Sequence, residues 1–178
     1  MSTNHPHLVS TIRTVPDFPK KGILFRDITT LLKDRNAFRE TVDILCEHYS
    51  GQRIDKVACV ESRGFILGAA LALRLDAGFV PIRKKGKLPA AKLQQEYALE
   101  YGTDVIEVHR DAISKGEHVL IHDDLLATGG TIAAACKLVE ELGGSICGLS
   151  FLIELGFLNG RSQLGAYDVF SVIRYDAE

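Results

Sequence analysis

No apolar stretch in the 178-residue sequence reaches the ~18 residues that a membrane-spanning helix needs. The N-terminal segment MSTNHPHLVS lacks the basic region and hydrophobic run of a secretory signal. The formal net charge of -2 provides no overall positive field that would attract nucleic acid or an anionic membrane. We therefore expect a cytoplasmic protein that binds neither, with any anion site confined to a local cluster.

The sequence also lacks the short motifs of common metal and nucleotide sites. Its four cysteines form no CxxC pair and its six histidines form no HExxH, so a zinc site is not expected. Neither GxxxxGK[ST] nor GxGxxG occurs, which excludes a Walker-type loop and the dinucleotide fingerprint. Cys59 and Cys147 lie in apolar runs, where a reduced thiol packs as a small hydrophobic group. We expect structural thiols and no metal bound directly by the protein.

The sequence does have the composition of an ordinary globular domain, with 46% hydrophobic and 25% charged residues. The length suits one hydrophobic core, so a single domain over 1–178 is expected. Apolar runs alternate with helical patterns, which predicts an α/β fold, a mainly parallel twisted sheet flanked by helices. Strands are expected at 56–61, 78–82, 119–122 and 146–155, and helices near 38–49, 64–75 and 131–142, with Asp34 or Asn36 as the N-cap of the first helix.

The segment 83–117 is too long for a simple connection between two strands of a compact domain. Tyr97 begins an alternation of larger apolar and smaller or polar residues, and a second apolar run follows the turn-like residues 102–104. This pattern predicts a β-hairpin that projects from the sheet. A flap over a site and a purely structural surface hairpin are both compatible with it.

One segment, VLIHDDLLATGGT at 119–131, combines a buried strand, two acids and a glycine-rich helix start. Glycines and the free N–H groups of a helix N-terminus favour a phosphate at 127–131. Asp123 and Asp124 would repel a phosphate placed against them, but they suit ribose hydroxyls or a divalent cation. The combination indicates a phosphorylated sugar, although TGGT taken alone is also typical of an ordinary turn.

The same segment resembles the phosphoribosyl-pyrophosphate motif of the type I phosphoribosyltransferases, and DDLLATGGT is similar to the adenine-specific branch of that family. Three further segments agree: FPKKGILFRD at 18–27, ESRGF at 61–65, and RKKGKLP at 83–89 together with LEYG at 99–102. The resemblance implies a base-recognition segment within 1–35 and a flexible catalytic loop within 83–117. It also implies a non-proline cis peptide at Glu61–Ser62.

The activity implied by the resemblance is Mg²⁺-assisted transfer of ribose 5-phosphate from phosphoribosyl pyrophosphate to adenine, giving AMP and pyrophosphate in purine salvage, by a homodimer. Mg²⁺ is expected to travel mainly on the sugar donor, because this ion dehydrates reluctantly. The resemblance assigns the sugar part of the donor to two groups of residues: the 5-phosphate to Ala127, Thr128, Gly129, Gly130 and Thr131, and the ribose with its cationic transition state to Asp123 and Asp124. It assigns pyrophosphate to Ser62, Arg63, Arg83 and Lys87, with Lys87 acting from the neighbouring subunit. It assigns adenine to Leu24, Phe25, Arg26 and Leu125, and proton transfer at the base to Glu100.

Plainer readings of these residues remain open. One aspartate could cap a helix, the basic run at 83–87 could be a solvated surface, Glu100 could be an exposed strand carboxylate, and Phe25 could belong to the core. His122 departs from the family pattern, in which Val or Ile is usual; it is either a hydrogen-bonded core residue or an influence on the pH dependence of the adjacent acids. Competing functions are a noncatalytic sensor of the sugar donor and activity on another purine.

Overall fold

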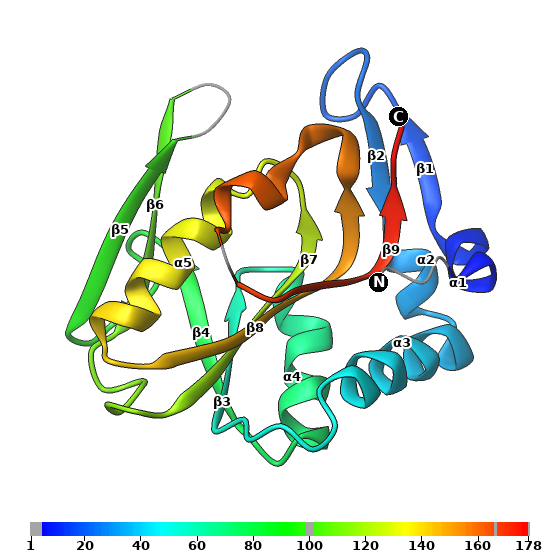
Figure 1. Cartoon of the computed structure of the whole chain (residues 1–178). Coiled ribbons are helices and arrows are strands. Elements are labelled where there is room, and N and C mark those ends of the chain that lie inside the picture. The colour runs from blue at the N-terminus through cyan, green and yellow to red at the C-terminus, as the bar shows by residue number, and fades with distance from the viewer. Residues whose placement is uncertain (1–4, 99–101, 166, 178) are drawn as a thin grey trace.

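The computed structural model describes residues 5–98, 102–165 and 167–177. Seven strands form the main sheet in the order β5-β6-β4-β3-β7-β8-β9, and a separate hairpin, β1-β2, stands beside β9 (Figure 1). The main-sheet strands are β3 (Lys56–Val60), β4 (Gly78–Lys84), β5 (Lys92–Ala98), β6 (Thr103–His109), β7 (His118–Leu126), β8 (Ser145–Leu155) and β9 (Val169–Tyr175); the hairpin consists of β1 (Arg13–Pro16) and β2 (Leu24–Asp27).

Five strands that are neighbours in the sheet, β4, β3, β7, β8 and β9, pair in parallel. β5 and β6 form an antiparallel hairpin at one edge, next to β4. The hairpin joins the parallel part where Arg83 pairs with Glu107 and Lys84 with Ile106. Both the mainly parallel sheet and the hairpin expected within 83–117 are therefore confirmed.

Helices cover both faces of the sheet. Alternate residues of β3 point to opposite faces: Val57 and Cys59 belong to the core that includes residues of α3 and α4, whereas Ala58 and Val60 belong to the core that includes residues of α5. A parallel sheet buried on both sides accounts for the nearly continuous apolar strands in the sequence. The helices are α1 (Pro6–Thr11), α2 (Thr29–Leu32), α3 (Arg35–His48), α4 (Gly64–Arg74) and α5 (Gly130–Glu141), with 3₁₀ turns η1 (Gly156–Leu158) and η2 (Gly160–Gln163).

The start of α3 resolves the choice between its two possible N-caps. The Asp34 side chain accepts hydrogen bonds from the backbone N–H groups of Asn36 and Ala37, at 2.8 and 3.0 Å. These bonds satisfy two of the free donors of the first helical turn and hold the pKa of Asp34 below its usual value. Asp34 is therefore the cap, and Asn36 lies inside the helix.

Two features differ from the expectation. β7 continues to Leu126, because its pairing with β8 extends to Leu126–Glu154, so both acids lie in a strand and not in a loop. β9 and the β1-β2 hairpin were not expected, because each strand depends on a partner that the local sequence does not identify. No helix among the described residues is long and apolar enough to cross a membrane.

Candidate active site

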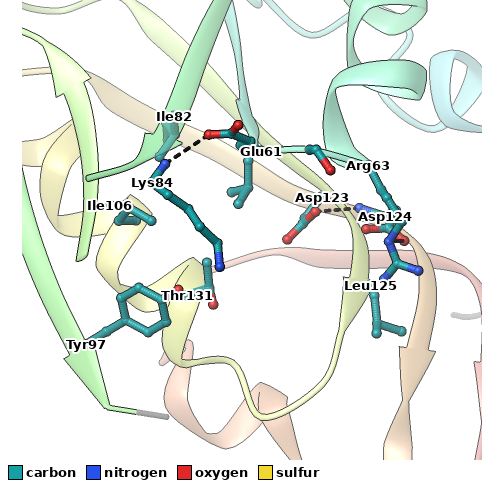
Figure 2. A pocket seen from close by; sticks show the side chains of 12 residues that line it. Glu61, Arg63, Ile82, Lys84, Tyr97, Ile106, Asp123, Asp124, Leu125 and Thr131 are labelled. Atoms are coloured by element: carbon teal, nitrogen blue, oxygen red, sulfur yellow. Dashed lines mark hydrogen bonds and ion pairs between the residues drawn. The ribbon is translucent and has the colours of Figure 1, made fainter. Parts of the chain in front are cut away.

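The site lies where the order of the strands reverses. From β3 the chain passes to β4 on one side and later returns to β7 on the other, so β3 and β7 are neighbours with diverging connections. Open α/β sheets bind ligands at the carboxyl ends of such strands. A cavity of about 320 Å³ opens there, and Figure 2 shows its walls. It is lined by Val60, Glu61, Ser62, Arg63, Ile82, Lys84, Tyr97, Ile106, Asp123, Asp124, Leu125 and Thr131.

The two acids face this cavity from β7. Asp124 is only 4% exposed, and its Oδ2 lies 3.0 Å from Arg63 Nε. Asp123 Oδ1 accepts a hydrogen bond from the backbone N–H of Asp124 at 2.8 Å. Burial, reinforced by the charge of Asp124, raises the pKa of Asp123 well above its ordinary value. A ligand that donates hydroxyl hydrogen bonds, or carries positive charge, would stabilise the two buried carboxylates that lie side by side.

The glycine-rich loop follows directly after β7. Gly129 has a φ of 88° and is the N-cap of α5, which begins at Gly130. A second cavity of about 60 Å³ adjoins the first and is bordered by Ala127, Thr128, Gly129 and Thr131. The loop therefore presents a helix N-terminus, with free backbone donors, beside the acid pair, as a sugar phosphate requires.

The loop after β3 forms the opposite wall of the cavity. Ser62 and Arg63 both line it, and the peptide bond between Glu61 and Ser62 is cis, as the family resemblance implied. Arg63 can present guanidinium donors to an anion while it remains paired with Asp124.

The basic run is only partly at the cavity. Arg83 donates to both carboxylate oxygens of Glu61, at 2.9 and 3.2 Å, and this pairing lowers the pKa of Glu61. Its Nη1 also donates to the carbonyl of Lys87. Neither Arg83 nor Lys87 is among the described residues that line the cavity, whereas Lys84 is. In Figure 2 the Lys84 side chain extends across the opening towards Thr131.

Lys84 and Tyr97 are cavity residues that the sequence reasoning missed. Lys84 Nζ lies 3.2 Å from Asp104 Oδ2, and this hydrogen bond raises the pKa of Lys84. The Tyr97 hydroxyl donates to the same oxygen at 3.3 Å, and the neighbouring Thr131 side chain opposes the rise in the pKa of Tyr97 that its burial causes. These contacts link the hairpin to the glycine-rich loop. The only signals in the sequence were the basic run and the alternation that begins at Tyr97.

The residues assigned to the base lie near one end of the cavity, but only Leu125 lines it. Leu24, Phe25 and Arg26 are on β2, in the hairpin beside β9 (Figure 1). Arg63 Cζ lies 5.1 Å from the centre of the Phe25 ring, so that ring stands next to the loop after β3. Glu100, assigned to proton transfer, lies outside the described residues.

His122 precedes the acids in β7 and is fully buried. Its Nδ1 is 2.8 Å from Ser150 Oγ, whereas Nε2 has no hydrogen-bond partner among the described residues. Burial lowers the pKa of His122 to about 4, so the ring is neutral at physiological pH. A neutral imidazole bonded to Ser150 agrees with the core reading, and an influence on the acids stays a prediction.

The fold and the cavity together define a class of protein. It is an open α/β protein with an acid pair at the point where the strand order reverses, beside a helix N-terminus of the kind that binds phosphate. Residues 27–177 match the family model described as the phosphoribosyl transferase domain. The chain therefore belongs to the phosphoribosyltransferase family, and its relatives place it in the adenine branch.

Among those relatives, the adenine phosphoribosyltransferase of Acidobacterium capsulatum is 58% identical over 174 residues, covering 98% of this chain and 96% of the relative. A crystal structure of adenine phosphoribosyltransferase from Thermoanaerobacter pseudethanolicus has a TM-score of 0.93 at 54% identity, covering 96% of this chain and 99% of that one. The Giardia lamblia enzyme in complex with 9-deazaadenine has a TM-score of 0.92 at 39% identity, with 98% and 99% covered.

Proposed function

We propose that this protein transfers ribose 5-phosphate from phosphoribosyl pyrophosphate to adenine. The bond between ribose C1 and the pyrophosphate oxygen breaks, a bond from C1 to adenine N9 forms, and the N9 proton is released, giving AMP and pyrophosphate. The observation that carries the proposal is the position of Asp123, Asp124 and the helix start at 127–131 around two adjoining cavities, both of which are lined by Asp123 and Thr131. The relatives named for this activity match nearly the whole length of this chain.

The acid pair has two tasks in this proposal. Its carboxylates accept hydrogen bonds from the ribose 2- and 3-hydroxyls, and their negative charge favours the cationic ribose that develops as pyrophosphate leaves. The loop at 127–131 holds the 5-phosphate and so fixes the sugar. Arg63 and Ser62 stabilise the departing pyrophosphate. Arg83 joins them once ligand binding brings its side chain towards the cavity, and Lys87 acts from the neighbouring subunit.

Adenine would lie between Leu125 and the β1-β2 hairpin. Phe25 stacks on the purine, and the backbone of Leu24 and Arg26 reads the edge that presents an amino donor beside the N1 acceptor. Guanine and hypoxanthine present the reverse pattern, which would leave buried backbone groups unpaired. Glu100 is assigned, on the grounds of the sequence alone, to a hydrogen bond with adenine N7 and to management of the proton that the base loses.

Mg²⁺ is proposed to enter on the donor. The carboxylates of Asp123 and Asp124 offer oxygen ligands of the right kind, whereas Glu61 is occupied by Arg83. Oxygens of the donor and water would complete the coordination of Mg²⁺, because this ion dehydrates reluctantly. The bound ion would neutralise pyrophosphate charge. Activity should disappear with a chelator and return with added Mg²⁺; unchanged activity in the chelator would refute this role.

A homodimer is proposed from an apolar face near the site. Ile66 and Leu73, seven residues apart on α4, are 45% and 83% exposed, and Phe79 on the adjacent β4 is 39% exposed. A face of this kind is typical of a subunit interface. Leu73→Glu should shift the sedimentation coefficient to that of a monomer and lower activity, because Lys87 would no longer reach the neighbouring site. An unmodified protein that is a fully active monomer would contradict the shared site.

The experiment that tests the function measures the nucleotide formed from adenine, hypoxanthine and guanine, each with phosphoribosyl pyrophosphate and Mg²⁺. AMP from adenine, with little product from the other bases, is expected. Formation of IMP or GMP instead would reassign the base. Donor binding without any nucleotide product would favour the sensor. The cytoplasmic location stays a prediction of the sequence.

A further inference from the structure

The glycine-rich loop is packed against a segment that has had no role so far, residues 156–163. A methyl group at Gly129 would lie 2.4 Å from the carbonyl oxygen of Gly160, and one at Gly160 would lie 2.2 Å from the carbonyl oxygen of Ala127. The two backbones therefore touch with no side chain between them. In Figure 1 this segment, in orange, lies over the beginning of α5. Any displacement of Gly160 must move the loop.

Gly160 is held in place by the residue that follows it. The Arg161 guanidinium donates to both carboxylate oxygens of Glu154, at 2.7 and 2.6 Å, and to the backbone carbonyl of Val169 at 2.9 Å. Ser171 donates to Glu154 Oε2 at 2.7 Å, and Arg174 donates to Oε1 at 2.7 Å. Glu154 is 2% exposed, and its bonds with Arg161 counteract the effect of burial and lower its pKa. A bidentate pair in such a buried network fixes its members closely.

Glu154 also lies beside the other end of the loop. In the β7–β8 pairing it is opposite Leu126, the last strand residue before Ala127. The Glu154 backbone is therefore paired with the strand that leads into the loop, and its carboxylate binds Arg161, which directly follows Gly160.

We propose that Arg161 and Glu154 are positioning residues that set the geometry of the 5-phosphate loop. The proposal rests on the proposed function, in which residues 127–131 hold the phosphate. Neither side chain lines the two cavities beside the acids, so both act through the backbone of Gly160. Backbone N–H donors lose much of their hydrogen-bond energy when misplaced by fractions of an ångström to an ångström, so loss of the pair should weaken phosphate binding selectively.

The test compares Arg161→Met with Arg174→Met by calorimetric titration of the full-length protein. Both variants remove a partner of Glu154, but only Arg161 is joined to Gly160. Arg161→Met should weaken ribose 5-phosphate binding about tenfold or more, while pyrophosphate binding changes less than about twofold. Arg174→Met should lower stability but change ribose 5-phosphate affinity less than about threefold. Arg161→Lys keeps the charge without the fork and should give an intermediate loss of affinity.

Equal losses of ribose 5-phosphate affinity in the two methionine variants would overturn the proposal, because the network would then act only through general stability. Parallel losses of ribose 5-phosphate and pyrophosphate binding would overturn it as well. If Arg161→Met does not fold, Arg161→Lys alone decides, since ribose 5-phosphate affinity equal to that of the unmodified protein would refute the positioning role. Failure of the unmodified protein to bind ribose 5-phosphate would instead refute the proposed function of the loop.

Discussion

Arg63 Nε lies 3.0 Å from Asp124 Oδ2, so the loop proposed for pyrophosphate and the acid pair proposed for ribose are joined by one ion pair. The guanidinium opposes the effect of burial on Asp124, whose pKa is nevertheless raised. Without Arg63, the Asp124 carboxylate would be a buried charge with little to offset the cost of removing it from water. The groups proposed to bind the two halves of the sugar donor therefore depend on each other.

Arg63→Gln should lower kcat/KM for the donor by about 100- to 1,000-fold, because it removes a donor to pyrophosphate and the partner of Asp124. Without the guanidinium the pKa of Asp124 rises further, so the acid limb of the pH–rate profile should move to higher pH. Arg74→Gln, which breaks an exposed pair with Asp43, is the control. An unshifted acid limb in Arg63→Gln would show that this pair does not govern the ionisation of the acids.

Tyr97→Phe removes the hydroxyl that donates to Asp104 and lies beside Thr131. The net energy of such a bond is about 1 kcal/mol, so KM for the donor should rise about threefold to tenfold, with a smaller change in KM for adenine. Tyr167→Phe removes a hydroxyl bonded to Glu140, away from the cavity, and should leave both constants unchanged. Equal KM values for the donor in the two variants would mean that the Tyr97 hydroxyl does not contribute to donor binding.

Glu100→Gln should lower kcat about 100-fold while adenine affinity changes little, because the amide keeps the shape but cannot take part in proton transfer. Glu96, which is exposed on β5, provides the matched variant Glu96→Gln, which should retain kcat. Single-turnover kinetics of both variants would check this. A Glu100→Gln enzyme with the kcat of the unmodified protein would reduce Glu100 to an exposed strand carboxylate.

His122 should make folding sensitive to mild acid. Its folded-state pKa of about 4 lies below the ordinary value of 6.5, so the unfolded chain binds the proton more readily. The contribution of the neutral His122 ring to the free energy of unfolding is fully present above pH 6.5 and is lost as the pH falls towards 4. Between pH 7 and 5 the loss due to His122 is roughly 2 kcal/mol.

His122→Val should remove that part of the pH dependence in urea unfolding measured at the two pH values. If the two proteins lose the same free energy of unfolding, the imidazole is not the titrating group. The pH–rate profile of the same variant tests the second reading of this residue. An unchanged profile would leave His122 a core residue without influence on Asp123 and Asp124.

The features predicted from the sequence are those encoded by neighbouring residues. The β7 acids, the helix start at Gly130 and the β5-β6 hairpin each follow from a local pattern, so they were found in nearly the right places. Lys84 and Arg161 were missed for a physical reason: their partners are brought near by the tertiary fold. Glu154 meets Arg161 across an irregular turn, and Ser171 across a strand pairing, and neither contact has a periodicity in the sequence.

The most direct test of the central claim is the rate of AMP formation from adenine and phosphoribosyl pyrophosphate in Asp123→Asn and Asp124→Asn, with the exposed Asp111→Asn as control. If the pair binds the ribose hydroxyls and favours the developing cation, each site variant should lose at least about 100-fold in kcat/KM, equivalent to about 3 kcal/mol of transition-state stabilisation, and the control should lose none. Near-normal kcat/KM in both site variants would show that Asp123 and Asp124 have no part in binding or transferring the ribose.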